Sequence, residues 1–299
     1  MGERGERRGS TRAEQARRHT EEMARRFGGE IAACVAATRP YDGMPKARAA
    51  RTCVPSVSVV DEDATFAVLA RGRGLASACD LAVLDFASFL YPAGGYERGN
   101  WGQEQALCAE SFLFNVLREH AGWYAENRRR HVNCHLYSNR ALVVPRVRFE
   151  RDRYHSYADV IVAAAPDARR AREEYRVDDE ALLAALRSRV RLVMAIADEL
   201  GHERVVLGAF GCGVFGWDAA VVAEAFRAEL AGGGHVAREV VFAVPRGRAD
   251  ENLEVFQHAL STFPDANPAP YVSRAERAAA EAAAAEPLDD EDDDWRQYL

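Results

Sequence analysis

Apolar and polar positions alternate along this chain with two different periods. Short runs that are β-branched or continuously apolar predict strands at 54–60, 81–86, 140–149, 159–164, 204–209 and 239–244. Apolar residues at helical spacing predict helices at 11–37, 64–70, 103–120, 181–200, 218–230 and 252–260. Because strands alternate with helices of this length, we predict a three-layer α/β fold, with helices on both faces of a mostly parallel or mixed sheet.

Small and acidic residues mark several boundaries. Gly28 and Gly29 interrupt the first helical pattern, so we expect a helix, a break and further helix. The acidic segment 61–63 is typical of a helix start before residue 64. The run 81–86, Leu-Ala-Val-Leu-Asp-Phe, is typical of a strand buried on both faces.

The two ends of the chain differ from its body. We predict a disordered segment at 1–10, a helical extension at 11–50, a core at 51–263 and an acidic tail at 264–299. After residue 270, nine acidic residues and three arginines supply −6 of the net charge of −7. The body is therefore nearly neutral, and its overall acidity does not argue against an anionic ligand.

Composition excludes several classes of protein. No apolar run is long enough for a membrane span and no signal peptide is present, so we expect a cytoplasmic protein. Lys46 is the only lysine, which disfavours lysine-based catalysis. The cysteines form no Cys-x-x-Cys pair, and we expect reduced thiols at Cys34, Cys53, Cys79, Cys108, Cys134 and Cys212.

Two glycine-rich loops follow predicted strands and precede predicted helices. The first, 91–102, contains four glycines and Trp101, and leads into Gln103-Glu104-Gln105. The second, Gly211-Cys212-Gly213-Val214-Phe215-Gly216, has G-x-G-x-x-G spacing before a helix that begins at Asp218. Glycines let backbone N–H groups approach a diphosphate, and the helix dipole favours its charge.

A dinucleotide-binding dehydrogenase would carry this fingerprint at its first strand, with an acid at the end of the next. Here the fingerprint lies near the C-terminus, and Glu239 begins the following strand. We therefore favour a cleft that grips a diphosphate on one side and a sugar on the other.

At these loops the sequence resembles the bacterial-type poly(ADP-ribose) glycohydrolases, a branch of the ADP-ribose-binding macrodomains. The resemblance covers about residues 15–262 and is carried by Asp85-Phe86-Ala87-Ser88, by 91–95, by 103–108, by 137–145 and by 208–216. It implies a macrodomain-like mixed sheet. It also implies that the first loop holds the ribose beside the scissile bond and that Phe215 packs against that ribose.

The resemblance further implies a set of site residues and no cofactor or metal. The catalytic positions are Glu104 and Gln105, the latter standing where the family has its acid. The implied ligand-binding residues are Asp85, Ser88, Gly94, Gly95, Gln103, Gly211, Cys212, Gly213, Val214, Phe215 and Gly216.

The departures from the family pattern fall on the chemistry. Asp85 replaces an asparagine, Tyr91 an asparagine and Ala93 a glycine, and Gln105 replaces the catalytic glutamate. Glutamine can hold a sugar hydroxyl but is not a useful acid. Glu104, Glu97 or Asp85 could take over that role, or the substitution could be engineered to trap a ligand.

Other constellations are weaker. His131, Cys134 and His135 lack a clear fourth metal ligand, so we predict a surface connector there and no metal. Cys212 fits its loop through small size. The N-terminal arginines are interleaved with glutamates, which indicates a solvated helix face and no sequence-specific nucleic-acid binding.

We conclude that the sequence predicts an ADP-ribosyl glycohydrolase or a weakened derivative, with an inactive ADP-ribose reader as the alternative. The expected partner is ADP-ribose or an ADP-ribosylated macromolecule, bound by a monomer. Glycohydrolase activity and simple binding differ in whether a carboxyl group protonates the leaving oxygen.

Overall fold

The computed structural model describes residues 11–45 and 53–285. The segment predicted to be disordered, 1–10, and the aspartate run of the tail lie outside the described residues. The described strands form one seven-stranded sheet in the order β1-β4-β5-β3-β6-β7-β2. Their bounds are β1 (Arg39–Asp42), β2 (Ser56–Val60), β3 (Leu81–Phe86), β4 (Arg140–Arg151), β5 (Tyr154–Ala163), β6 (Arg204–Leu207) and β7 (Glu239–Ala243).

The sheet is mixed, as predicted. β5, β3, β6, β7 and β2 pair in parallel, whereas β4 is antiparallel to both β5 and β1. The registers Val83↔Val160 and Val83↔Val206 place the carboxyl ends of β5, β3 and β6 side by side at one end of the sheet. The loops that follow these three strands therefore meet at that end.

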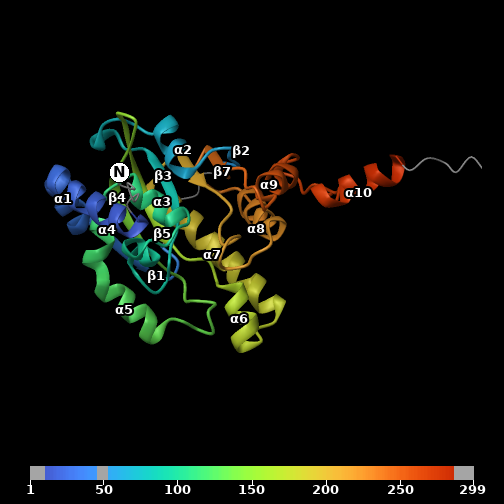
Figure 1. Ribbon diagram of the computed structural model, residues 1–299, viewed down its shortest axis with the longest axis horizontal. Coiled ribbons are helices and arrows are strands. Elements are labelled where there is room, and N and C mark those ends of the chain that lie inside the picture. The colour runs from blue at the N-terminus through green and yellow to red at the C-terminus, as the bar shows by residue number, and fades with distance from the viewer. Residues whose placement is uncertain (1–10, 46–52, 286–299) are drawn as a thin grey trace, which may run out of the picture.

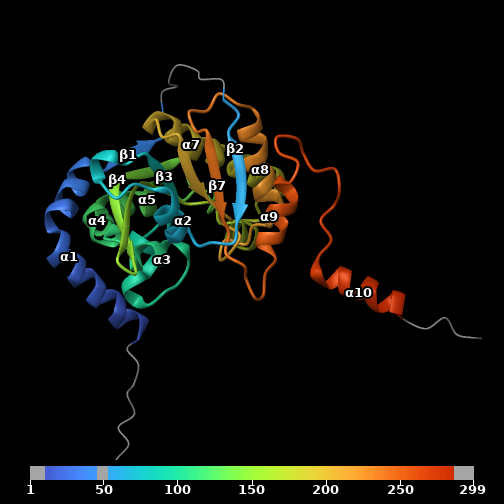
Figure 2. The ribbon, with the colours of Figure 1, turned by 90° about the horizontal axis from the view of Figure 1, so that it is seen from above.

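Helices cover both faces of the sheet and complete the three predicted layers (Figures 1 and 2). One face carries α1 (Arg12–Ala37), α2 (Ala64–Arg71), α3 (Gln103–Ala109), α4 (Leu113–Leu117) and α5 (Ala121–Arg130). The other carries α6 (Ala168–Tyr175), α7 (Asp179–Leu200), α8 (Ala219–Ala231) and α9 (Asn252–Leu260). α10 (Arg274–Ala285) projects from the body.

β3 is the central strand of this arrangement. Successive side chains of a strand point to opposite faces, so Leu81 and Val83 pack on the α1 side while Ala82 and Leu84 pack on the α7 side. Each of these four residues is at most 1% exposed. The strand is thus buried on both faces, as its apolar run predicts.

Helix boundaries follow local chemistry. Thr11 caps α1 in a capping box: its hydroxyl accepts from the Glu14 N–H at 3.3 Å, and its own N–H donates to the Glu14 carboxylate at 2.8 Å. The break expected at Gly28 and Gly29 is a kink at Phe27 (φ −127°, ψ 25°). Asp63 caps α2, as the acidic segment predicts.

Some predicted boundaries were wrong. The helix expected over 103–120 is two short helices, because Ser111 leaves the helical path and bridges Phe149 of β4. The strands β4 and β5 are longer than predicted and join as a hairpin, where Asp152 and Arg153 both have positive φ. Several arginines interrupt the alternation of apolar and polar residues along β4, so its sequence pattern does not show the full length of the strand.

Three elements were not predicted at all: β1, α5 and α6. β1 lies inside the expected helical extension of 11–50, yet it pairs with β4 and forms an edge of the sheet. The N-terminal segment thus contributes a strand to the same sheet as the core.

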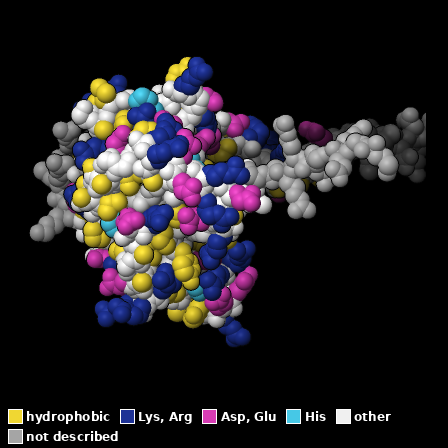
Figure 3. Space-filling view, turned by 60° about the vertical axis from the view of Figure 1, so that its left-hand side comes forward, with side chains coloured by type: hydrophobic (Ala, Val, Ile, Leu, Met, Phe, Trp, Pro, Cys, Tyr) yellow, Lys and Arg dark blue, Asp and Glu magenta, His cyan; other side chains and the backbone are white. Residues whose placement is uncertain are grey.

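Charges on the surface are mixed. On the face shown in Figure 3, basic and acidic side chains are interspersed with apolar ones and no field of one sign is visible. In the described parts of the chain, no helix combines the length and the apolar character that crossing a membrane requires.

Candidate active site

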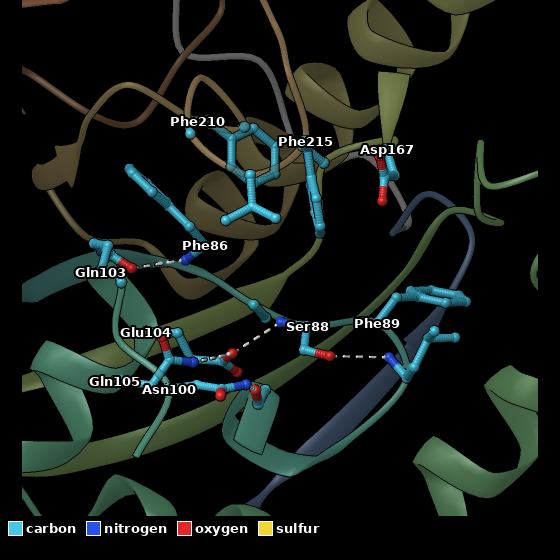
Figure 4. Close-up of a pocket in the computed structure, with 18 of the residues that line it drawn as sticks. Phe86, Ser88, Phe89, Asn100, Gln103, Glu104, Gln105, Asp167, Phe210 and Phe215 are labelled. Atoms are coloured by element: carbon cyan, nitrogen blue, oxygen red, sulfur yellow. Dashed lines mark hydrogen bonds between the residues drawn. The ribbon is translucent and has the colours of Figure 1, made fainter. Parts of the chain in front are cut away.

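A cavity of about 550 Å³ opens at the carboxyl ends of the parallel strands, where the loops after β3, β5 and β6 meet (Figure 4). Both glycine-rich loops line it, so the structure brings together segments about 120 residues apart in the chain. Because this is the edge where parallel α/β sheets bind ligands, the cavity is the candidate site.

The first loop owes its shape to left-handed backbone. Within the 3-10 segment η2 (Pro92–Arg98), Ala93, Gly94 and Gly95 have φ of 47°, 55° and 91°. A Cβ on Gly94 would lie 2.8 Å from Gln105 Nε2 and 2.9 Å from Glu104 Oε2. This position therefore needs glycine both because its φ is positive and because a Cβ has no room there. Ala93 holds the same conformation with a side chain, at a cost in strain.

Gln103 ties the start of α3 to the end of β3. Its Oε1 accepts from the Phe86 N–H and its Nε2 donates to the Leu84 carbonyl, both at 2.9 Å. The β3–β6 register runs only from Leu81 to Val83, so the Gln103 amide continues the pairing of β3 where β6 turns away. This side chain is therefore a positioning group for the two residues that follow it.

Glu104 and Gln105 follow at the cavity wall. The Ser88 N–H donates to Glu104 Oε2 at 3.0 Å, and Gln105 Nε2 donates to the same oxygen at 3.3 Å and to the Ala93 carbonyl at 2.9 Å. Both side chains are buried, at 3% and 8% exposure, and both line the cavity. Figure 4 shows them beside Ser88 and Asn100.

Asp85 lies beneath this wall, in a buried group with Glu104, Cys108 and Tyr124. Alternation along β3 turns Asp85 to the α3 side of the sheet, where it is fully buried. Among the described residues, neither oxygen of Asp85, nor Glu104 Oε1, nor the Tyr124 hydroxyl has a hydrogen-bond partner. Asp85 is thus buried without any hydrogen-bond donor among the described residues, and Glu104 has donors at Oε2 alone.

These surroundings favour the neutral form of both carboxyl groups. Burial raises the pKa of Asp85, and burial followed by the charge of Asp85 raises the pKa of Glu104, against a smaller lowering by the Ser88 N–H. Burial and the same two carboxyl groups raise the pKa of the Cys108 thiol and the Tyr124 hydroxyl.

The second loop is held by Trp217. Gly211 has φ +80°, and a Cβ there would lie 2.8 Å from both Ala165 and Trp217 side-chain atoms. The Trp217 N–H donates to the Gly211 carbonyl at 3.2 Å, and its indole N–H donates to the Pro166 carbonyl at 2.7 Å. Asp218 then caps α8. The loop is fixed to the end of β5 as well as to β6.

Aromatic side chains form the walls of the cavity. Phe86 packs against Phe210 with ring centroids 5.6 Å apart, and Phe89 stacks on Tyr137 at 4.5 Å. Phe215 meets Tyr137 edge-on at 6.4 Å. This sets an apolar slot beside the wall that carries Glu104 and Gln105, a combination that suits a sugar ring.

A second cavity of about 680 Å³ adjoins the first at the carboxyl ends of the parallel strands. It lies between the end of β7, the starts of α2 and α9, and α3. The two cavities share the following lining residues: Phe86, Trp101, Gly102, Gln103, Ala209 and Gly213. One elongated ligand could therefore occupy both.

Comparison with known proteins agrees with this architecture. Residues 11–152 match the family model of the microbial-type PARG catalytic domain, where PARG is poly(ADP-ribose) glycohydrolase. The PARG of Thermomonospora curvata bound to the inhibitor ADP-HPD is 32% identical to this chain, with a TM-score of 0.68, and the match covers 82% of this chain and 97% of that one. The chain belongs to the microbial-type PARG family.

A second PARG structure is similarly close. The PARG of Deinococcus radiodurans in complex with ADP-ribose is 32% identical, with a TM-score of 0.67, and the match covers 78% of this chain and 98% of that one. A search of the curated proteins found no match.

Within this PARG fold, most predicted site residues line the first cavity. They are Ser88, Gly94, Gln103, Glu104, Gln105, Gly211, Gly213, Val214 and Phe215. The others, Asp85, Gly95, Cys212 and Gly216, are not among its lining residues. Burial raises the pKa of the Cys212 thiol to about 12, so a thiolate is not available there at neutral pH.

Four polar residues of the cavity were not among the predicted site residues: Asn100, Tyr137, Asp167 and Arg170. Asp167 follows β5 by four residues, and β5 lies next to β3, so the ends of adjacent parallel strands could have indicated it. Tyr137 belongs to a segment that the buried Arg189 organises, since this guanidinium donates to the Tyr137 and Ser138 carbonyls at 3.0 and 2.9 Å.

The connector that carries His131, Cys134 and His135 is irregular. Cys134 and His135 have positive φ, so the i, i+4 spacing of the histidines is not helical. His131 contacts the Ser138 hydroxyl at 3.3 Å, and His135 contacts Glu174 at 3.2 Å.

We expect Asp85→Asn to weaken the pH dependence of stability. The folded-state pKa values of Asp85 and Glu104 are raised, so their stabilising contribution is complete at low pH and is lost as pH rises through those values. Between pH 5 and 8 the variant should lose about 1–3 kcal/mol less free energy of unfolding than the native chain, measured by urea denaturation. The matched exposed variant Asp152→Asn should keep the native slope. A native slope in Asp85→Asn would contradict the buried pair.

Proposed function

We propose that this chain binds ADP-ribose across the two adjoining cavities. The observation that carries this proposal is their arrangement: the second glycine-rich loop lines both the first cavity, with its apolar slot, and the second cavity. ADP-ribose has the same order of groups, with a diphosphate between two nucleoside-sized ends. The ADP-ribose complex of the Deinococcus relative supports the assignment.

The second loop is the proposed diphosphate site. Its glycines allow close backbone approach, and it leads into α8, a 13-residue helix whose N-terminal dipole favours an anion. Arg170 also lines the first cavity, although it pairs with Glu174 at 2.6 Å. Backbone N–H groups therefore supply most of the proposed anion binding, in keeping with the nearly neutral body.

The apolar slot is the proposed site of the ribose whose glycosidic bond is broken in the family. Phe215 would pack on its face, and Ser88, Glu104 and Gln105 lie on the opposite wall. We propose the second cavity for the adenosine end, which fits its volume of about 680 Å³ and its position beyond the shared wall.

We further propose that the native chain binds ADP-ribose well and hydrolyses ADP-ribosyl bonds slowly at most. Hydrolysis needs an acid that protonates the leaving oxygen as the ribose gains oxocarbenium character. Gln105 stands at that wall and can donate a hydrogen bond but no proton. The loss of a general acid typically costs about 10²–10⁴-fold in rate.

One observation favours an active enzyme as the second candidate. Glu104 lines the cavity, and burial followed by the charge of Asp85 raises the pKa of its carboxyl group, which is the direction that a general acid requires. However, Oε2 already accepts two hydrogen bonds, and Oε1 is buried. This geometry suits a group that holds a ribose hydroxyl better than one that protonates a leaving group.

We expect isothermal titration calorimetry to detect ADP-ribose binding, and Phe215→Ala to weaken it roughly tenfold or more, because the aromatic face of the slot is lost. Tyr154→Ala, which removes a 76% exposed aromatic ring at the β4–β5 turn, should bind as the native chain does. Absence of binding by the native chain would overturn the proposed function.

Restoring a carboxyl group at position 105 tests the chemical part of the proposal. Gln105→Glu should release ADP-ribose from a poly(ADP-ribosyl)ated protein about 10²–10⁴-fold faster than the native chain, with little change in affinity. Gln105→Asn, which keeps an amide, is the control and should stay slow. Rapid release by the native chain that Glu104→Gln abolishes would instead make Glu104 the acid.

A further inference from the structure

Three potential metal ligands lie close together at the end of the sheet where β3 and β6 begin. The cavity lies at the opposite end of these strands. Cys79 lies in the connection before β3, His202 in the turn between α7 and β6, and Asp159 on β5 beside Ala82. Their Sγ, imidazole nitrogen and carboxylate oxygen all lie within 4.8 Å of one another. No other such three-donor group occurs in the part of the chain that the structure describes.

The donor atoms already touch in pairs. His202 Nε2 lies 2.9 Å from Asp159 Oδ2, and the Cys79 thiol donates to Asp159 Oδ1 at 3.5 Å. Zinc bonds of about 2.0–2.3 Å place neighbouring ligands of a tetrahedron roughly 3.3–3.8 Å apart. Because the three donor atoms lie within 4.8 Å of one another, side-chain shifts of about an ångström are enough for them to surround one ion.

The carboxylate is oriented by a contact that an ion would not displace. The Arg146 N–H donates to Asp159 Oδ1 at 2.7 Å, at the bulge of β4 between Val144 and Val147. Oδ2 is then the oxygen available to an ion. Hydrogen bonds of this kind to a ligating carboxylate are common around protein metal sites.

The donor types select the class of ion. One sulfur, one imidazole nitrogen and one carboxylate oxygen suit Zn²⁺ and exclude the all-oxygen shells that Mg²⁺ and Ca²⁺ prefer. Cys79 and His202 are half-buried and Asp159 is 8% exposed, so solvent can reach the site and supply a fourth ligand. Thiolate and carboxylate together would balance the charge of a divalent ion.

We propose that Cys79, Asp159 and His202 bind a divalent transition-metal ion of the zinc type, with water as the fourth ligand. On binding, the Cys79 thiol releases its proton to solvent and the sulfur bonds the ion. The ion would join the α2–β3 connection and the α7–β6 turn to β5. Because it lies at the opposite edge of the sheet, its role is structural and independent of the proposed ADP-ribose site.

Cobalt reports this coordination directly. The reduced full-length chain, freed of metal with a chelator and titrated with Co²⁺, should develop the near-ultraviolet charge-transfer absorption of a cobalt thiolate and the visible bands of tetrahedral cobalt. Zn²⁺ should displace both signals and raise the midpoint of thermal unfolding by roughly 5 °C at hundredfold excess over Kd.

Two variants assign the ligands. Cys79→Ser should abolish the charge-transfer band, and His202→Gln should weaken Co²⁺ binding roughly tenfold or more while the band remains at saturation. Cys134→Ser removes an exposed thiol from the His131–His135 connector and should bind Co²⁺ as the native chain does.

The outcomes separate clearly. A native chain without the band, a band that survives in Cys79→Ser, or a band that disappears in Cys134→Ser would overturn the proposed site. If Cys79→Ser fails to fold by circular dichroism, the weakened binding of His202→Gln decides. ADP-ribose affinity should be the same with and without the ion, so failure here leaves the proposed function intact.

Discussion

The candidate site depends on a single side-chain amide. Gln103 pairs with the backbone of β3 through both of its polar atoms, at the point where β6 diverges from β3. Without that bridge, a partly buried N–H and a partly buried carbonyl at the end of the central strand would lose their partners, which is costly. The same bridge fixes the first turn of α3, so Glu104 and Gln105 can reach the cavity wall only in one arrangement.

The loops on either side are built around this fixed point. The left-handed run at 93–95 curves the first loop over the side chains of Glu104 and Gln105, and Gly94 has no room for a Cβ. Trp217 holds the second loop to the end of β5. The wall and the second loop are both fixed by hydrogen bonds, and such preorganisation favours binding because little ordering remains to be done.

The proposal that binding and turnover are separated rests on the side chains of this wall. Asp85 and Glu104 are buried together and their pKa values are raised, and the Gln105 amide lies beside them. An amide can hold a sugar hydroxyl but cannot act as a general acid. On the proposed account, the site therefore keeps the groups that recognition needs and lacks a side chain that protonates the leaving oxygen.

Local sequence predicted those parts of the fold that local chemistry determines. The apolar run of β3, the cap at Asp63 and both glycine loops follow from propensity and turn rules. β4 could not be recognised fully, because its arginines are stabilised by partners distant in sequence, such as Glu110 with Arg151 at 2.7 Å. The two glycine-rich loops of the site could be predicted because their glycines and the strands before them are recognisable in the local sequence.

Long-range packing explains what the sequence did not reveal about the site. Asp167 reaches the cavity because β5 lies beside β3, and Arg189 holds the segment that carries Tyr137. Asp85 was expected at the ligand, yet the alternation of β3 turns it beneath the wall. The meeting of Cys79, Asp159 and His202 is likewise a product of sheet order, since no spacing in the chain relates these residues.

A crystal structure of the native chain with ADP-ribose tests the central claim most directly. The account predicts the diphosphate against residues 211–216, the ribose on Phe215, and the Gln105 amide as the side-chain group nearest the anomeric carbon. A ligand outside these cavities, or a carboxyl oxygen of Glu104 in hydrogen-bond contact with the anomeric oxygen, would contradict it.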